Sequence, residues 1–158
     1  MAPSLGQFII SMICKFPEEV KPHCAQIGTI IKHLLSSEMR QEALALQISS
    51  ALFERIGIFD ETFLRELFTQ IFTVMHFYRN NTKNKVIPIT ITKAIHIFFA
   101  TYMINQGCDK LVQACDNIQP GILFMILKSE GDKIKFCTSP ARDRKYVIVA
   151  YTHLALDF

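Results

Sequence analysis

The chain has 158 residues, of which half are hydrophobic and a fifth are charged, and 17 basic against 14 acidic side chains give a formal net charge of +3. This excess is well below that of a dedicated nucleic-acid-binding domain, so the charge indicates no nucleic-acid partner. The longest apolar-rich stretch, residues 86–104, contains Lys93 and Pro88, which excludes a membrane-spanning helix of about 20 apolar residues. An odd number of cysteines, five, indicates free thiols in a reducing, intracellular compartment.

The first third of the chain shows apolar residues at helical spacing and no clean alternation of the kind seen in half-buried strands. The first predicted helix covers residues 4–16 and ends before a proline. The second covers residues 21–36, with Pro22 in the first turn, where the missing N–H is not needed. The third covers residues 39–56 and ends at Gly57, a residue that accepts a left-handed backbone.

The middle of the chain contains two longer helical patterns. Asp60 is a suitable N-cap for a helix over residues 60–79, which carries a wide apolar stripe. The next pattern covers residues 85–106 and has Pro88 near its first turn and Gly107 after its end. Its first residues are β-branched and would also suit a strand, but its length and later spacing favour a helix.

The last third is less regular. A short helix is predicted over residues 109–118, followed by a break at Pro120-Gly121 and a second apolar run over residues 122–128. Residues 129–145 are the most polar part of the chain and predict a loop. A final helix is expected from about residue 141 to residue 155.

Taken in pairs, the predicted helices start at intervals of roughly 40 to 55 residues, close to the 40 to 47 residues of HEAT and armadillo repeats. Short connections make paired helices antiparallel neighbours. The sequence therefore predicts an all-α fold of antiparallel helix pairs stacked as a HEAT-type α-solenoid fragment of about three to four repeats. The expected division is a half repeat over 1–16 and repeats over 17–57, 58–107 and 108–158. A compact helical bundle would show similar stripes.

The first predicted helix begins with an apolar stripe of Leu5, Phe8, Ile9 and Met12. A terminal solenoid repeat normally turns a polar outer face to water. We therefore expect the chain to be a slice of a longer solenoid, and we expect its exposed end helices to let copies of the fragment associate.

A family resemblance rests on residues 107–128, which read GCDKLVQACDNIQPGILFMILK. The element Asp-Asn-Ile-Gln-Pro at 116–120 follows a helix that ends in Tyr-Met-Ile-Asn-Gln-Gly at 102–107, and this combination resembles the importin-β superfamily, most closely the CAS-type exportins. The chain departs from that pattern after Lys128, where such exportins continue with an apolar, proline-containing helix and this chain becomes polar.

The resemblance implies HEAT repeats from the C-terminal half of a nuclear export receptor that returns importin-α to the cytoplasm with Ran-GTP. It implies importin-α and the GTPase Ran as partners, shuttling between nucleus and cytoplasm, and no enzymatic activity. Another importin-β-type transport receptor is an alternative. An independent helical bundle that holds an apolar ligand is a further one, since the chain has 13 Phe and 6 Met.

The residues give no pattern for catalysis, metal binding or a cofactor. There is no C-x-x-C or H-x-x-x-H pair, no phosphate-binding glycine pattern and no nucleophile elbow. Cys108 and Cys115 are expected to be small buried thiols. His76 and His96 are flanked by aromatic residues and are expected at the edge of the core.

One local charge bias remains as a candidate for partner contact. It is a basic cluster near the C-terminus that consists of Lys133, Lys135, Arg142, Arg144 and Lys145. A solvated loop would explain it fully. The functional interpretation is that inter-helix loops of a solenoid line one face, where this cluster would meet an acidic surface on a partner.

Overall fold

The structure is a computed structural model that describes residues 2–36, 41–57, 61–81, 86–136 and 141–157. Within these ranges the chain contains helices and turns and no strand. The elements of the first part are α1 (Ala2–Lys15), α2 (Pro17–Val20), the 3-10 turn η1 (Lys21–His23), α3 (Cys24–Leu35) and α4 (Glu42–Arg55). Those of the second part are α5 (Glu61–Asn81), α6 (Ile89–Gln106), α7 (Cys108–Asp116), α8 (Ile122–Glu130), the 3-10 helix η2 (Gly131–Phe136) and α9 (Ala141–Asp157).

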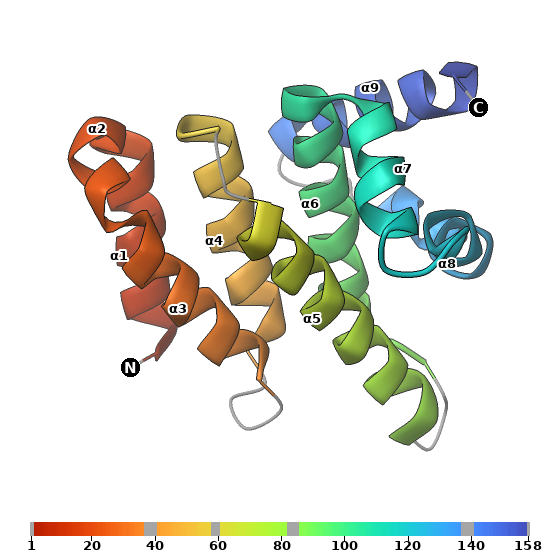
Figure 1. The fold of residues 1–158 in the computed structure, drawn as a ribbon, viewed down its shortest axis with the longest axis horizontal. Coiled ribbons are helices and arrows are strands. Elements are labelled where there is room, and N and C mark those ends of the chain that lie inside the picture. Colours follow the sequence, from red (N-terminus) through yellow and green to blue (C-terminus); the bar gives the residue numbers. More distant parts are fainter. Residues whose placement is uncertain (1, 37–40, 58–60, 82–85, 137–140, 158) are drawn as a thin grey trace.

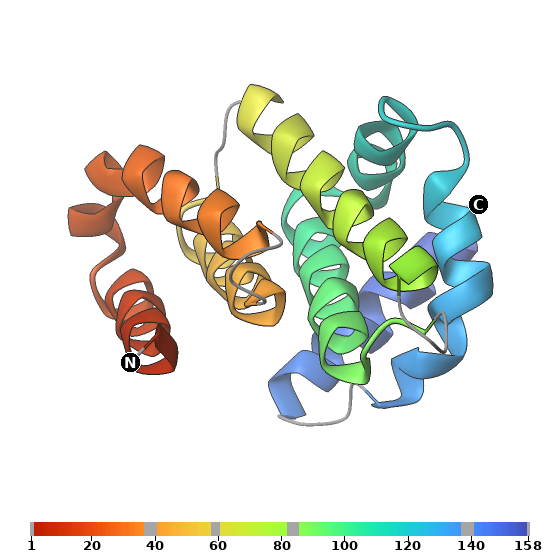
Figure 2. The same ribbon diagram turned by 90° about the horizontal axis from the view of Figure 1, so that it is seen from below.

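The helices form two rows (Figures 1 and 2). In the first row α1 packs on α4, α4 on α6 and α6 on α9, while in the second row α3 contacts α5 and α5 contacts α7. The rows are joined where α3 packs on α4 and α7 on α6. This arrangement confirms the predicted all-α solenoid fragment of stacked helices.

Two glycines end helices in the way the sequence predicts. Gly57 has a φ of 81° and Gly107 a φ of 99°, which is the region where an L side chain is strained. The Gly107 N–H donates to the Met103 carbonyl at 2.8 Å and so closes the last turn of α6. Gly107 also lets the chain turn directly into α7, which starts at the next residue, Cys108.

Several predicted boundaries need correction. The helix predicted from residue 85 starts at Ile89, with Pro88 as its N-cap. Pro88 has an extended ψ of 137°, as N-cap residues usually do, while its carbonyl accepts from the Thr92 N–H at 3.0 Å. The predicted loop over 129–145 is wrong for residues 129–136, because α8 continues to Glu130 and residues 131–136 form η2. The predicted final helix is confirmed as α9, which starts at Ala141. The expected N-cap Asp60 lies outside the described residues.

The core between the rows is aromatic. The buried rings of Phe53, Phe68, Phe98 and Tyr102 meet one another edge-on or tilted, and the centroids of Phe68 and Phe98 are 5.6 Å apart. Each such pair contributes about 0.5–1.5 kcal/mol beyond the burial of its surface. These rings connect α4, α5 and α6, so the Phe-rich stripes of the sequence are used for packing between helices.

A small residue brings α3 close to α5. A Cβ atom added to Gly28 would lie 2.8 Å from the ring of Phe63, so the ring covers the glycine directly. Gly6 has the same relation to the side chain of Leu44 between α1 and α4. Interhelical distances depend on the side chains at the contact, and glycine permits the shortest.

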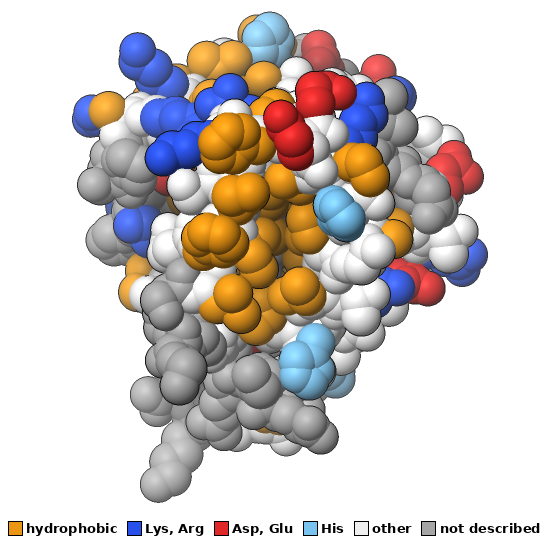
Figure 3. All heavy atoms as spheres, turned by 90° about the vertical axis from the view of Figure 1, so that its left-hand side faces the viewer, with side chains coloured by type: hydrophobic (Ala, Val, Ile, Leu, Met, Phe, Trp, Pro, Cys, Tyr) orange, Lys and Arg blue, Asp and Glu red, His pale blue; other side chains and the backbone are white. Residues whose placement is uncertain are grey.

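Apolar side chains remain exposed at the α1 end of the rows (Figure 3). Leu5 and Phe8 are each 60% exposed, and an apolar groove of about 400 Å³ lies beside them, between α1 and α3. At the other end, Ile148 and Leu156 of α9 are exposed as well. Association of copies through these ends stays a prediction. No described helix has both the length and the apolar character needed to cross a bilayer.

Candidate protein-binding surface

A groove of about 660 Å³ runs along the first row and is lined by α1, α4, α6 and α9. Its apolar floor includes the small side chains of Ala51 and Ala94 and the larger, partly buried side chain of Ile97. Polar side chains such as Gln47 and Thr90 stand at its edges and are exposed. A surface with an apolar floor and a polar rim is suited to contact with another protein.

Charged residues close one end of this groove and join α4 to α9. Arg142 pairs with Glu54, and its guanidinium lies 5.5 Å from the centroid of the Tyr146 ring. The Tyr146 hydroxyl donates to the same carboxylate at 3.4 Å. Burial raises the pKa of Asp143, and the positive charges of Arg142 and Lys93 oppose that rise. Both signs of charge are therefore present where a partner would enter.

In the structure, the residues of the predicted basic cluster have different surroundings. Lys133 turns inward and donates to Glu130 at 2.6 Å, and Arg142 is held at the end of the first-row groove. Lys135, Arg144 and Lys145 are exposed, and Arg142 is exposed as well although it is paired with Glu54. The five residues therefore do not form a single patch of exposed charge, and a role in partner contact stays a prediction for the exposed ones.

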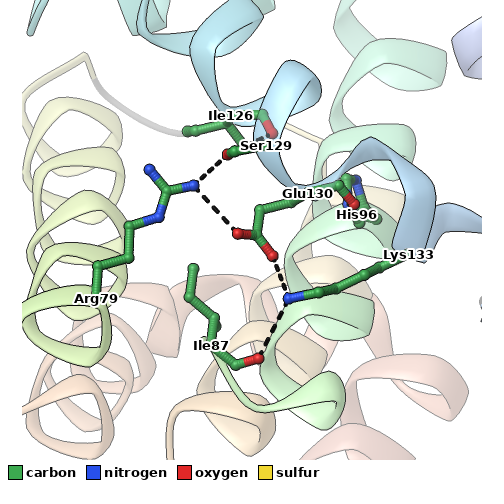
Figure 4. Close-up of polar contacts among 7 residues, drawn as sticks. All are labelled: Arg79, Ile87, His96, Ile126, Ser129, Glu130 and Lys133. Atoms are coloured by element: carbon green, nitrogen blue, oxygen red, sulfur yellow. Dashed lines mark hydrogen bonds and ion pairs between the residues drawn. The ribbon is translucent and has the colours of Figure 1, made fainter. Parts of the chain in front are cut away.

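Glu130 is the centre of a buried polar cluster (Figure 4). It is 6% exposed and accepts from Arg79 of α5 at 3.1 Å and from Lys133 of η2 at 2.6 Å. Arg79 also donates to the hydroxyl of Ser129, and Lys133 to the carbonyl of Ile87 at 3.5 Å. A buried carboxylate with two cationic partners is a structural tie, here between α5, α8 and η2.

His96 extends this cluster to α9. Its Nδ1 lies 2.8 Å from the Tyr151 hydroxyl and its Nε2 lies 3.3 Å from the Glu130 carbonyl, which fits a neutral ring that accepts at Nδ1 and donates at Nε2. Burial lowers the pKa of His96, which favours the neutral form. The expected core-edge position thus understates the burial of His96, and it is wrong for His76, which is exposed.

The sequence element at 116–120 has a clear structural role. The Asp116 carboxylate accepts from the N–H of Gly121 at 2.8 Å, and Gly121 has a left-handed φ of 73°. This contact fixes the turn between α7 and α8, so the element determines how the second row ends.

The thiols of the described cysteines are free. Cys108 and Cys115 are buried, as expected, and burial raises the pKa of Cys115 to about 12, so its thiol stays protonated and unreactive at neutral pH. The described residues contain no group of three His, Cys, Asp or Glu side chains that would hold a metal ion.

Sequence reasoning did not find the contacts that shape these sites. Glu54 and Tyr146 are 92 positions apart, and Arg79 and Glu130 are 51 apart. No local motif signals such pairs. The one available hint was that Glu130 comes at the end of the segment that contains the apolar run 122–128.

Comparison with known proteins supports one family. Residues 2–158 match the family described as CAS/CSE protein, C-terminus. A search of curated proteins and a search of solved structures gave no match. Since the family match covers nearly the whole chain, this chain belongs to the CAS/CSE C-terminal family of exportin-type nuclear transport receptors.

Proposed function

We propose that the chain is a protein-binding part of a receptor that carries importin-α back to the cytoplasm in a complex with Ran-GTP. The observation that carries this proposal is the family match over residues 2–158. It follows that the receptor shuttles between nucleus and cytoplasm and catalyses no reaction. Another importin-β-type receptor function would share the fold but not this family.

The stacked helices suit such a task. We assign a half repeat to 1–16 and repeats to 17–57, 58–107 and 108–158, so that the successive pairs are α3 with α4, α5 with α6, and α7 and α8 with α9. In a solenoid each repeat contacts only its neighbours, so small rotations between repeats add up to a change of overall curvature. If the GTPase binds one curvature of the receptor more tightly, it raises the receptor's affinity for cargo that prefers the same curvature. Cargo then raises the affinity for the GTPase by the same factor.

We place the partner contact at the first-row groove. It lies across several repeats, combines a floor of small apolar residues with a polar rim, and carries both signs of charge at its α9 end. A partner helix or loop that enters it would cover the floor and form ion pairs between its own charged side chains and Glu54 or Arg142. The independent-bundle alternative expected a pocket lined by Phe and Met, whereas neither residue type lines this groove, the apolar groove beside α1 or the groove between α5 and α7.

The test compares two identical substitutions on different rows. Gln47→Arg puts a long cation into the groove, and Gln70→Arg puts it on the exposed face of α5, away from the groove. The dissociation constant of importin-α for the receptor that carries this chain is measured with Ran-GTP present. We expect Gln47→Arg to weaken binding about tenfold or more and Gln70→Arg to leave it within about twofold. Equal effects of the two variants would remove the groove from the proposal.

A further inference from the structure

A second groove lies on the opposite row and shares no lining residue with the first. It has a volume of about 540 Å³, lies between α5 and α7, and reaches the C-terminal end of α6. This volume is within the range of about 300–1,000 Å³ that ligand sites occupy. Glu61 and Arg65 stand on the α5 wall, and Gln113 and Asn117, four residues apart, stand on the α7 side.

The floor of this groove contains a buried polar side chain. Tyr102 is 3% exposed, and its ring is held edge-on by Phe53 at 5.3 Å and Phe68 at 5.4 Å between centroids. Its hydroxyl has no hydrogen-bond partner among the described residues. The hydroxyl is not one of the fully buried unpaired polar atoms of the described residues, which are Gln41 Oε1 and Thr92 Oγ1, so it is open to the groove and can donate to a ligand atom there. Burial raises the pKa of Tyr102, which therefore remains a donor.

Two cations face each other across the groove. Arg65 of α5 and Lys110 of α7 are exposed and have no ion-pair partner in the described part of the chain. By contrast, Arg79, Lys133 and Arg142 each pair with a carboxylate. Glu61 is the one carboxylate among the residues that line the groove, so the lining carries a net positive charge.

The amides add a second kind of recognition. Gln113 and Asn117 are exposed, and each side chain offers both a donor and an acceptor, which matches the alternating N–H and C=O groups of an extended peptide. Gln106 uses its Nε2 to donate to the Gly57 carbonyl at 2.8 Å, which leaves its side-chain oxygen as an acceptor held in place. The two cations and the Tyr102 hydroxyl can all donate to a carboxylate. The amides of Gln113 and Asn117 can hydrogen-bond to the main chain of the peptide that carries this carboxylate.

We propose that this groove binds an extended acidic peptide segment of a partner protein. Its carboxylate is bound by Arg65 and Lys110 and by the Tyr102 hydroxyl, and its main chain is bound by Gln113 and Asn117. The site belongs to the second row, so it is independent of the surface to which we assign importin-α.

The test uses fluorescence anisotropy with two labelled ten-residue probes, one of alternating Ser and Glu and one of alternating Ser and Gln. We expect saturable binding of the Glu probe, about tenfold tighter than that of the Gln probe. Tyr102→Phe keeps the packed ring and removes only the hydroxyl, and it should weaken binding about threefold.

A matched pair of double variants separates the site from general attraction. Arg65→Glu/Lys110→Glu should weaken binding of the Glu probe about tenfold, whereas Lys15→Glu/Lys128→Glu, which changes net charge equally at exposed sites elsewhere, should stay within about twofold. No saturable binding of the Glu probe, or equal losses in the two double variants, would overturn the proposal.

Discussion

At the scale of single residues, the best-connected side chain is Glu130. It is almost fully buried and holds two cations, Arg79 and Lys133, that come from elements far apart in the chain. His96 adds a neutral ring that contacts the Glu130 carbonyl and the Tyr151 hydroxyl. These contacts connect α8 and η2 to α5, α6 and α9 and so fix how these helices lie against one another.

Removal of the Glu130 carboxylate tests this role. Glu130→Ala should lower the free energy of unfolding by about 2 kcal/mol, less than the 3–5 kcal/mol of a fully buried broken pair, because the two cations can reach water. Glu66→Ala breaks an exposed pair with Lys32 and should cost less than about 1 kcal/mol. Urea denaturation measures both values. Equal losses would show that the Glu130 cluster is no more than a surface ion pair.

His96 predicts a pH dependence with a defined sign. Its folded pKa is lowered by burial, so below about pH 6.5 the unfolded chain binds more protons at this site than the folded chain does. Stability should therefore fall as pH falls from 6.5, by at most about 1.4 kcal/mol per pH unit from this residue. His96→Gln should flatten the slope of unfolding free energy between pH 7 and about pH 5.5. An unchanged slope in that variant would contradict the assignment.

At the scale of elements, the described helices are held apart or drawn together by the side chains between them. Phe68 and Phe98 separate α5 from α6 by the width of two rings, while Gly28 lets α3 approach the Phe63 ring of α5. At these two contacts α5 therefore meets α6 through packed aromatic rings and meets α3 through a close approach that Gly28 permits.

Two Gly→Ala substitutions should have opposite signs. Alanine is favoured over glycine in a helix by about 1 kcal/mol, and Gly131 has open space around it, so Gly131→Ala should raise stability by about 0.5–1 kcal/mol. Gly28→Ala meets the Phe63 ring and should lower stability by about 1 kcal/mol. In a Phe63→Ala background the Gly28 penalty should disappear, which a double-mutant cycle of unfolding free energies measures. A penalty that persists there would mean that Phe63 is not its cause.

Local sequence signals decide which helices and which helix ends could be predicted. Apolar spacing, prolines and glycines act within a few residues, so the helices that end at Gly57 and Gly107 were found from the sequence. The 3-10 helix η2 was missed because it is short, because four of its six residues are glycine or charged, and because it is held by a contact between Lys133 and Glu130. The pairing of Glu54 with Arg142, and the grooves that such pairs border, depend on packing between distant segments and have no local signature.

At the scale of the whole molecule, two rows of helices present two different surfaces. The first-row groove has a floor of small apolar residues, and the groove on the second row is lined by cations and amides around Tyr102. The family match gives the molecule its class, a nuclear transport receptor, and in the function we propose the curvature of the stacked helices couples the binding of separate partners.

The most direct test of this account is the affinity of importin-α for the receptor that carries this chain, measured once with Ran-GTP and once with Ran-GDP. Coupling between two sites of one molecule is typically 1–3 kcal/mol, or about 5–150-fold in affinity. The account predicts that importin-α binds more tightly with Ran-GTP, by about fivefold or more. Equal affinity in the two states, or no binding in either, would contradict it.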